Sequence, residues 1–391
     1  MLLSLSEILT VACYNHLYHI HLTHRGATHL NTEKNTASYK KKHLYLILAV
    51  ELVLILCMLA VLYFMLSVPD KGPKVTILDP GQLSIPDEIV QQKEEGTGTM
   101  KGYMNIALFG VDAENDNQLY KGSRSDSTMI ASINLDTGDI KLCSIYRDTY
   151  LNIGTEYRKC NAAYFYGGAE QAVKMLNSNL DMDIENFITV GYKGLSKIID
   201  GLGGIYIDVD SEELKHINNY QYGCAKTMDT DYIPVEDAGY QLLNGLQATA
   251  YCRIRATAGS DFKRTARQRE VIRAIEDRAK KQDLATLTKV FNDSIGDIYT
   301  SIDSEDILTL LGNISNYHIV EEGGFPTSEL RTDVNFGAKG LCIVPTDLEK
   351  GVSWLHNFLF DDPDYQVTDT VKEFNAVIQA DTAAYRNRTQ K

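Results

Sequence analysis

The sequence predicts an α/β protein with a mixed central β-sheet and helices on both faces of that sheet, preceded by one transmembrane helix. Two observations carry this prediction. First, short runs that are apolar nearly throughout alternate with segments in which apolar residues recur at helical spacing. Second, residues 44–68 form one apolar segment, and about 25 residues in a helix span roughly 37 Å, enough to cross a bilayer.

The flanks of the apolar segment predict its orientation in the membrane. Lys40, Lys41 and Lys42 precede the segment, so the positive-inside bias places the N-terminus in the cytoplasm and the rest of the chain outside. A cleaved signal peptide is the alternative, but its apolar core would be shorter and no A-x-A site follows. We therefore expect a short cytoplasmic tail at 1–43, a transmembrane helix at 44–68 and an extracellular stalk at 69–102.

The globular part is expected at residues 103–362, followed by a C-terminal tail at 363–391. Within it, apolar runs without regular polar alternation are typical of strands covered on both faces. These runs are Met104–Val111, Thr128–Asn134, Ile140–Tyr146, Phe187–Val190, Ile205–Val209 and Thr249–Ile254. Helical spacing of apolar residues is found at Ala172–Leu180, Leu195–Ile199 and Ala266–Lys280.

Composition excludes some classes of partner. The formal net charge of -14 argues against nucleic acid, and no helix-turn-helix signature or basic stripe opposes that conclusion. Seven cysteines in 391 residues do not make a disulfide framework. Cys160 and Cys224 lie in polar segments and could pair with each other.

Arginines stand at the ends of the apolar runs. Arg124 precedes one run, Arg147 follows another, and Arg253 and Arg255 end a third. In an extended segment these last two share one face, while Ile254 between them faces the core. A guanidinium is always charged and is costly to bury unpaired. Several arginines at strand ends therefore predict a concentrated anion at this place.

Two carboxylates accompany the arginines. Asp112 and Asp126 would suit a hard divalent cation that bridges the anion. The simplest joint interpretation is a pyrophosphate site with Mg²⁺, or Mn²⁺ as the alternative metal. Each carboxylate also has a structural alternative. Asp112 could cap the turn after the first strand, and Asp126 could pair with Arg124 on the surface.

A helix that follows adds further polar candidates. Arg264, Arg267 and Gln268 lie at i, i+3 and i+4, hence on one face, and are expected in the first turn, where the helix dipole favours an anion. Gln268 could instead form a capping box with Thr265. Asp261 could contact the ligand or brace the arginines.

The segment after Tyr146 supplies the last candidates. Arg147 and Asp148 are adjacent, so in an extended backbone they point to opposite sides, and we favour Arg147 for the site. Asp148 is a candidate general base. Lys159 and Asn161 are candidate donors placed behind the direct ligands.

These motifs occur in an order that resembles a known family. In this sequence they are Asn105 to Asp112, Arg124-Ser125-Asp126, Ser144 to Thr149, Lys159 to Tyr164, Asp200 to Gly204, Leu243-Asn244-Gly245, Tyr251 to Arg255, Asp261-Phe262 and Arg264 to Gln268. Together they resemble the LytR-CpsA-Psr family over roughly Tyr103 to Lys281. The chain departs from the family pattern at Tyr146, where a proline usually precedes the arginine, and at Ser260, which is an extra residue.

The resemblance implies a membrane-anchored extracellular phosphotransferase with an α-β-α fold. Such enzymes move an anionic glycopolymer, a teichoic acid or a capsular or secondary wall polysaccharide, from a polyprenyl-pyrophosphate carrier to a peptidoglycan hydroxyl. Asp112 and Asp126 would match the Mg²⁺-associated carboxylates, and the expected catalytic residues are Arg147, Arg255 and Asp148. The expected pyrophosphate-binding residues are Arg124, Arg147, Lys159, Asn161, Arg253, Arg255, Arg264, Arg267 and Gln268.

Two other functions stay open at this point. A polyprenyl-pyrophosphate hydrolase would use the same groups with water as the nucleophile, and a cell-envelope regulatory protein would not turn over substrate. A polyprenyl tail also requires an apolar channel between sheet and helices. The sequence does not assign the lining of that channel, because every helix already needs an apolar face for the core.

Overall fold

The computed structural model describes the chain at residues 74–113, 116–257 and 260–386. The chain divides into two units, Met1–Asp70 and Lys71–Lys391, and all described residues belong to the second. The predicted cytoplasmic tail and transmembrane helix lie outside the described residues. Among the residues that are described, no helix combines the length and the apolar character needed to cross a membrane.

A mixed sheet forms the centre of the described part, as predicted. Its strand order is β1-β10-β7-β2-β3-β4-β11. The bounds are β1 Lys74–Val75, β10 Ile298–Thr300, β7 Asn186–Gly191, β2 Tyr103–Val111, β3 Ser125–Asn134, β4 Asp139–Ile145 and β11 His318–Phe325. β2 runs parallel to β7 and antiparallel to β3, which makes the sheet mixed.

Smaller elements accompany the central sheet. Within the described part of the chain, three two-stranded sheets pair β5 Tyr150–Asn152 with β6 Tyr157–Lys159, β8 Ile205–Val209 with β9 Gly239–Leu243, and β12 Arg331–Asn335 with β13 Leu341–Pro345. The 3₁₀ helices are Pro80–Gln82, Asp116–Leu119, Ile295–Asp297, Ile314–Asn316, Ser328–Leu330 and Gly337–Lys339. The apolar run Ile205–Val209 is thus a strand, as predicted, but it lies outside the central sheet.

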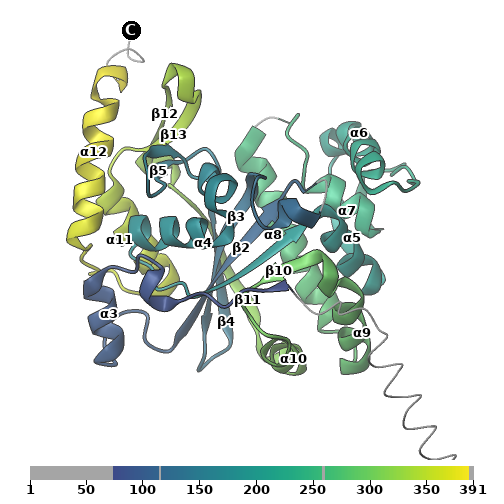
Figure 1. Ribbon diagram of the computed structural model, residues 1–391. Coiled ribbons are helices and arrows are strands. Elements are labelled where there is room, and N and C mark those ends of the chain that lie inside the picture. The colour runs from purple at the N-terminus through teal and green to yellow at the C-terminus, as the bar shows by residue number, and fades with distance from the viewer. Residues whose placement is uncertain (1–73, 114–115, 258–259, 387–391) are drawn as a thin grey trace, which may run out of the picture. The chain divides into compact units, whose positions relative to one another are not determined.

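Helices cover both faces of the sheet (Figure 1). One side carries α3 Asp87–Glu94, α4 Asn161–Leu180, α11 Leu348–Phe360 and α12 Asp369–Arg386. Their apolar faces enter the main core, where Val173, Leu176 and Leu355 are fully buried beside Phe109 and Ile130 of the sheet. Apolar residues at helical spacing on α4 and α11 account for this packing.

The other side carries α5 Tyr192–Gly201, α6 Ser211–Met228, α7 Gly245–Tyr251, α8 Ser260–Ala279, α9 Leu284–Ser294 and α10 Ser304–Gly312. Ile272 of α8 packs against Leu142 of β4 and Ile319 of β11. The antiparallel pair β8–β9, whose strands are connected through α6, packs with α6 and α7 around a separate apolar cluster that includes Ile207 and Ile217. This second layer faces the sheet at the place where the site residues gather.

One predicted strand is wrong. Thr249–Ile254 was expected as a strand, but α7 ends at Tyr251 and a turn follows. The cause is a reciprocal capping box at the start of α7. The Asn244 side chain accepts a hydrogen bond from the Gln247 N–H, and the Gln247 side chain accepts one from the Asn244 N–H, both at 2.9 Å. This cap starts a helix and outweighs the strand-like composition that follows.

The expected stalk and C-terminal tail also need correction within the described residues. Between 74 and 102, Leu83 and Ile89 are buried in the main core, and β1 extends the central sheet. Beyond residue 362, α12 packs on α4 and α11, and Val371 and Ile378 are fully buried. Both segments therefore belong to the folded domain, because their apolar side chains complete its core.

Candidate functional site

A cavity of about 500 Å³ lies between the central sheet and the second helix layer. Its apolar part is lined by residues of β2, β3, β7, α5 and α8, among them Leu108, Met129, Ile188, Leu195, Ile198, Val271, Ile272 and Ile275. Charged and amide residues line its other part, namely Asp112, Asp126, Arg253, Arg255, Arg264 and Gln268. The cavity thus joins a polar end to an apolar channel.

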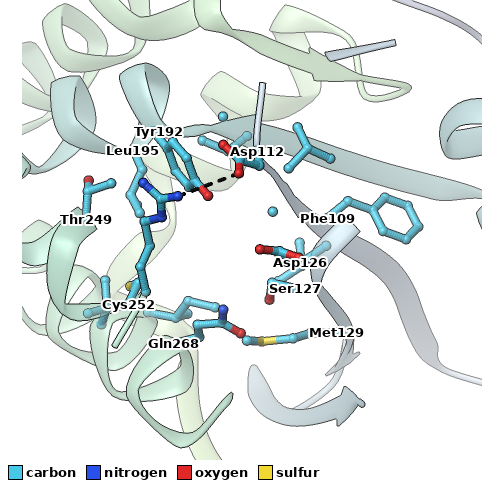
Figure 2. A pocket seen from close by; sticks show the side chains of 18 of the residues that line it. Phe109, Asp112, Asp126, Ser127, Met129, Tyr192, Leu195, Thr249, Cys252 and Gln268 are labelled. Atoms are coloured by element: carbon cyan, nitrogen blue, oxygen red, sulfur yellow. Dashed lines mark ion pairs between the residues drawn. The ribbon is translucent and has the colours of Figure 1, made fainter. Parts of the chain in front are cut away.

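Strand register explains why the polar end forms. β2 and β7 are parallel, and Val111 pairs with Gly191, so Asp112 and Tyr192 leave the sheet at the same edge. β3 runs the other way and begins opposite Val111, which brings Asp126 to that edge as well. Ligands of open α/β sheets bind outside such strand ends. Figure 2 shows Tyr192 beside Asp112, with Asp126 and Gln268 facing the same cavity.

Asp126 is the centre of the charged cluster. Its Oδ1 accepts a hydrogen bond from Arg147 Nη1 at 2.7 Å, and its Oδ2 accepts one from Arg255 Nη2 at 2.8 Å. Burial alone would raise the pKa of Asp126, but Arg147, Arg255 and Arg264 outweigh it and hold the pKa below its usual range. Arg124 is exposed and does not line the cavity. The surface pairing of Asp126 with Arg124, and a ligand role for Arg124, therefore find no support.

Arg253 connects the second carboxylate to an aromatic ring. Its Nη2 lies 3.6 Å from Asp112 Oδ2, its guanidinium carbon lies 4.2 Å from the ring centroid of Tyr192, and its Nη1 donates to Cys224 Sγ at 3.3 Å. Asp112 keeps 45% of its side chain exposed. Cys160 and Cys224 are both free and belong to different apolar clusters, so the disulfide considered from the sequence is absent.

Arg264 holds unpaired donors in the cavity. Its side chain is 2% exposed, and its Nη2 lies 2.7 Å from Asp261 Oδ1. Its Nε and Nη1, like Oε1 of Gln268, are buried without a hydrogen-bond partner in the described part of the chain. Burial lowers the pKa of Arg264 to about 10, although Asp261 opposes the shift. Buried guanidinium donors without partners are costly, and facing a cavity they indicate an anionic ligand.

The Arg147 group lies behind Asp126 and does not line the cavity. Arg147 Nε is 3.5 Å from Asp261 and 4.0 Å from Asp148, and Asp148 is 3.2 Å from Lys159 Nζ. The backbone N–H of Asn161 donates to the Arg147 carbonyl at 3.2 Å. Arg147 thus braces Asp126, and the neighbouring residues hold Arg147 and Asp148 in place. Asp148 is held by two cations away from the cavity, so this geometry gives no support for it as a general base.

Arg267 was predicted to bind pyrophosphate, but it lies in the protein core and does not line the cavity. Its side chain is 3% exposed, and all three of its nitrogens have protein partners. Nε donates to Glu213 at 2.6 Å, Nη1 to the Ile254 carbonyl at 3.0 Å, and Nη2 to Thr257 Oγ1 at 2.7 Å. Arg267 is therefore a satisfied core arginine. Because its nitrogens bond within the core and its side chain does not line the cavity, it is not placed to bind pyrophosphate.

The start of α8 corrects two further expectations. The helix begins at Ser260, so Arg264 and Gln268 lie beyond its first turn. Thr265 sits inside the helix and donates to the Asp261 carbonyl at 2.6 Å, which rules out the capping box with Gln268. Gln268 faces the cavity through its position on the helix, four residues after Arg264. Of the two roles left open for Asp261, its contacts with Arg147 and Arg264 favour bracing of the arginines.

Tyr146 shows how the chain accommodates its departure from the family pattern. Its ring packs edge-on against Phe262, with centroids 4.7 Å apart. The guanidinium carbon of Arg331 lies 3.7 Å from the centroid of Phe262 on the same cluster. Because Phe262 adjoins Asp261, this packing fixes the start of α8 close to Arg147.

Sequence reasoning missed two tyrosines that line the cavity. Tyr192 opens α5, and the hydroxyl of Tyr220 on α6 accepts a hydrogen bond from the Arg255 N–H at 3.1 Å. The sequence did contain a signal for Tyr192, because this residue directly follows an apolar strand, as Asp112 does. The carboxyl ends of parallel strands meet at one edge of a sheet, so the two residues were candidates for the same site.

Two of the helices that line the cavity, α5 and α8, change from polar to apolar lining residues along their length. On α8 the lining passes from Arg264 to Ile275, and on α5 it passes from Tyr192 to Leu195 and Ile198. Spacings of three, four, seven or eleven residues keep such side chains on one helical face. The cavity therefore suits a molecule with an anionic head and a long apolar tail.

Comparison with known proteins identifies the family. The profile of the LytR_cpsA_psr family matches residues 82–336, which is more than half of the chain. The chain belongs to the LytR_cpsA_psr family. The match begins inside the segment that the sequence predicted to be a stalk, in agreement with the folded state of residues 74–102.

Curated relatives are similar to this chain over part of their length. The polyisoprenyl-teichoic acid–peptidoglycan teichoic acid transferase TagT of Bacillus subtilis is 31% identical over 183 residues, covering 46% of this chain and 54% of TagT. The transferase TagU of Oceanobacillus iheyensis is 31% identical over 222 residues, covering 54% of this chain and 63% of TagU. Biofilm regulatory protein A of Streptococcus mutans is 27% identical over 257 residues, covering 59% and 61%. The chain thus spans only 54–63% of the length of these relatives.

Two solved structures show the same fold. The crystal structure of B. subtilis TagV has a TM-score of 0.54 at 23% identity, covering 68% of this chain and 99% of TagV. The structure of TagT bound to LIIa-WTA has a TM-score of 0.52 at 23% identity, covering 68% and 93%. The predicted fold, a mixed central sheet with helices, is confirmed.

Proposed function

We propose that this LytR_cpsA_psr protein transfers an anionic glycopolymer, a teichoic acid or a capsular or secondary wall polysaccharide, from a polyprenyl-pyrophosphate carrier to a hydroxyl of peptidoglycan. The observation that carries the proposal is one cavity in which arginines and two carboxylates lead into an apolar channel. The names of TagT and TagU, teichoic acid transferases to peptidoglycan, support it. The enzyme would act outside the cell, anchored through residues 44–68, which lie outside the described chain.

The cavity residues supply charge stabilisation and positioning. Arg253, Arg255 and Arg264 face the cavity and would hold the pyrophosphate, while Arg147 acts through Asp126. The acceptor hydroxyl oxygen would attack the sugar-side phosphorus while the bond from that phosphorus to the bridging oxygen breaks. Lipid monophosphate would leave, and the hydroxyl proton would pass to it or to solvent. Charge then builds on the departing phosphate, and positioned guanidinium groups stabilise it more than they stabilise the ground state.

A divalent cation fits the carboxylates at the polar end. Asp112 and Asp126 are oxygen ligands of the kind that Mg²⁺ and Mn²⁺ prefer, and Mg²⁺ commonly takes one or two carboxylates together with substrate phosphates. A carboxylate has about four acceptor positions, so Asp126 can ligate a metal while it accepts from two arginines. No group of three His, Cys, Asp or Glu side chains within the described ranges could hold a metal alone. Bound there, the cation would neutralise phosphate charge.

Replacing Asp112 with Asn is expected to raise the Mg²⁺ concentration for half-maximal transfer by about tenfold or more, because one carboxylate ligand is lost. The ligand-free protein should keep its melting temperature, since the contact of Asp112 with Arg253 is long and exposed. Titration of the transfer rate with Mg²⁺ and Mn²⁺ measures this. Asp208→Asn, an exposed residue outside the cavity, is the control. A titration curve identical to wild type would return Asp112 to a turn-capping role.

Replacing Leu195 with Trp is expected to narrow the apolar channel. The bulkier ring should occupy space that the prenyl tail needs, so binding of a long polyprenyl pyrophosphate should weaken by about tenfold or more. Binding of inorganic pyrophosphate, which has no tail, should stay unchanged. Leu284→Trp, on the exposed surface of α9, is the matched control. Equal losses for both ligands would show that the substitution disturbs the polar end and would remove the support for a separate tail channel.

The proposal predicts a specific co-purified molecule. Protein extracted from bacterial membranes should carry a polyprenyl pyrophosphate, detectable by mass spectrometry and by electron density in the cavity. The charged cluster should contact its phosphates, and its tail should follow α5 and α8. Bound lipid without phosphate, or density at another place, would contradict the proposal.

A further inference from the structure

Tyr192 presents a buried hydroxyl that has no hydrogen-bond partner among the residues that the structure describes. It is the first residue of α5, and the guanidinium of Arg253 lies over its ring. Figure 2 shows the residue beside Asp112, with its hydroxyl end toward the cavity that it lines. A buried polar atom without a partner is destabilising, so this placement indicates a ligand that supplies the missing hydrogen bond.

The neighbours of Tyr192 determine the class of that ligand. Arg253 lies against its ring, and Arg264 presents two unpaired nitrogens in the same cavity. Donors from several elements converge, so the ligand must offer several acceptor oxygens, as a phosphate does. A phenolic hydroxyl is ordinarily protonated at neutral pH, so Tyr192 can donate a hydrogen bond to such an oxygen.

The position of Tyr192 on α5 indicates which phosphate of the carrier's pyrophosphate, the sugar-side or the lipid-side one, lies beside its hydroxyl. Leu195 follows three residues later and Ile198 six residues later, both in the cavity lining, so the helix leads from the hydroxyl directly into the apolar channel. A carrier whose tail lies in the channel brings its own phosphate, the one esterified to the prenyl chain, to this hydroxyl. We propose that Tyr192 donates a hydrogen bond to the lipid-side phosphate of the carrier. This inference rests on the proposed function and adds a residue that binds the leaving group.

Two short lipids distinguish the two phosphates. Farnesyl pyrophosphate carries both phosphates, and farnesyl monophosphate carries only the lipid-side one. With the full chain, Tyr192→Phe keeps the ring and its contact with Arg253 and removes only the hydroxyl. The dissociation constants of both lipids should rise about tenfold, as expected for loss of a hydrogen bond to a charged group. The melting temperature without ligand should stay equal or rise, because an unpaired buried group is removed.

The outcomes separate this inference from the proposed function. Tyr206→Phe, an exposed tyrosine on β8 outside the cavity, should bind both lipids as wild type does. If Tyr192→Phe binds both lipids normally, or loses affinity for farnesyl pyrophosphate alone, the lipid-side contact is wrong and the proposed function stands. A lower melting temperature with unchanged affinities would show a purely structural tyrosine and overturn the inference. If wild-type protein binds neither lipid, the proposed function itself fails.

Discussion

Replacing Arg255 with Gln is expected to slow transfer by about 100- to 1000-fold, the usual loss when one donor to a developing oxyanion is removed. The melting temperature of the ligand-free protein should hardly change. Arg255 pairs with Asp126 at 2.8 Å, but its side chain is 37% exposed, and such pairs contribute about 0–1 kcal/mol. Asp126 also keeps its hydrogen bond from Arg147. A transfer assay beside a thermal melt measures both quantities.

Two further variants make the Arg255 result specific. Arg255→Lys should restore only part of the activity, because an ammonium offers a point charge in place of a planar fork. Arg273→Gln removes the same charge from an arginine that pairs with Glu322 outside the cavity lining, and it should leave transfer unchanged. If Arg255→Gln melts far below wild type yet transfers normally once folded, Arg255 has a structural role and the assignment of the polar end is wrong.

Replacing Arg267 with Met is expected to have the opposite profile. Glu213 would be left buried without its charged partner, which costs about 3–5 kcal/mol, a large share of the roughly 5–15 kcal/mol of a typical domain. The free energy of unfolding measured with denaturant should fall by that amount. Transfer per folded molecule should stay close to wild type, since Arg267 does not line the cavity.

A double variant tests the cause of this destabilisation. Adding Glu213→Gln to Arg267→Met removes the orphaned charge and keeps an acceptor for the Asp210 N–H at the start of α6. The double variant should therefore regain part of the lost stability, and the two substitutions should be non-additive. If Arg267→Met unfolds like wild type but loses transfer, Arg267 binds substrate, as the sequence suggested.

The central sheet is the part of the fold that the sequence predicts best. β2, β3, β4 and β7 lie between two helix layers, so their burial on both faces requires apolar runs that can be read directly. Thr249–Ile254 has the same composition but follows the capping box of Asn244 and Gln247, a helix signal that decides against a strand. In α12, Val371, Phe374 and Ile378 recur at helical spacing, and this signal could have placed residues beyond 362 in the domain.

For the site, too, some features could be predicted from the sequence and others could not. That arginines and carboxylates gather could be predicted, because charges at strand ends need partners or ligands. Which arginine lines the cavity could not be predicted. Arg255 and Arg267 were both expected to bind the anion, but Arg267 is held in the core by Glu213, which lies 54 positions away in the sequence, and only Arg255 lines the cavity. The channel lining also depends on tertiary packing. Leu195 and Ile272 resemble core residues in the sequence, and only the arrangement of α5 and α8 leaves a cavity between them and the sheet.

The central claim, transfer rather than hydrolysis or regulation, is tested most directly by the stoichiometry of one reaction. The purified full chain would be mixed with a polyprenyl-pyrophosphate-linked glycopolymer that carries a label in its sugar, with peptidoglycan and Mg²⁺. Lipid monophosphate and peptidoglycan-bound label would both be counted over time. We predict equal amounts of the two, with neither formed when peptidoglycan is omitted. Lipid monophosphate without bound label would show a hydrolase, and the absence of both products would contradict catalysis by this cavity.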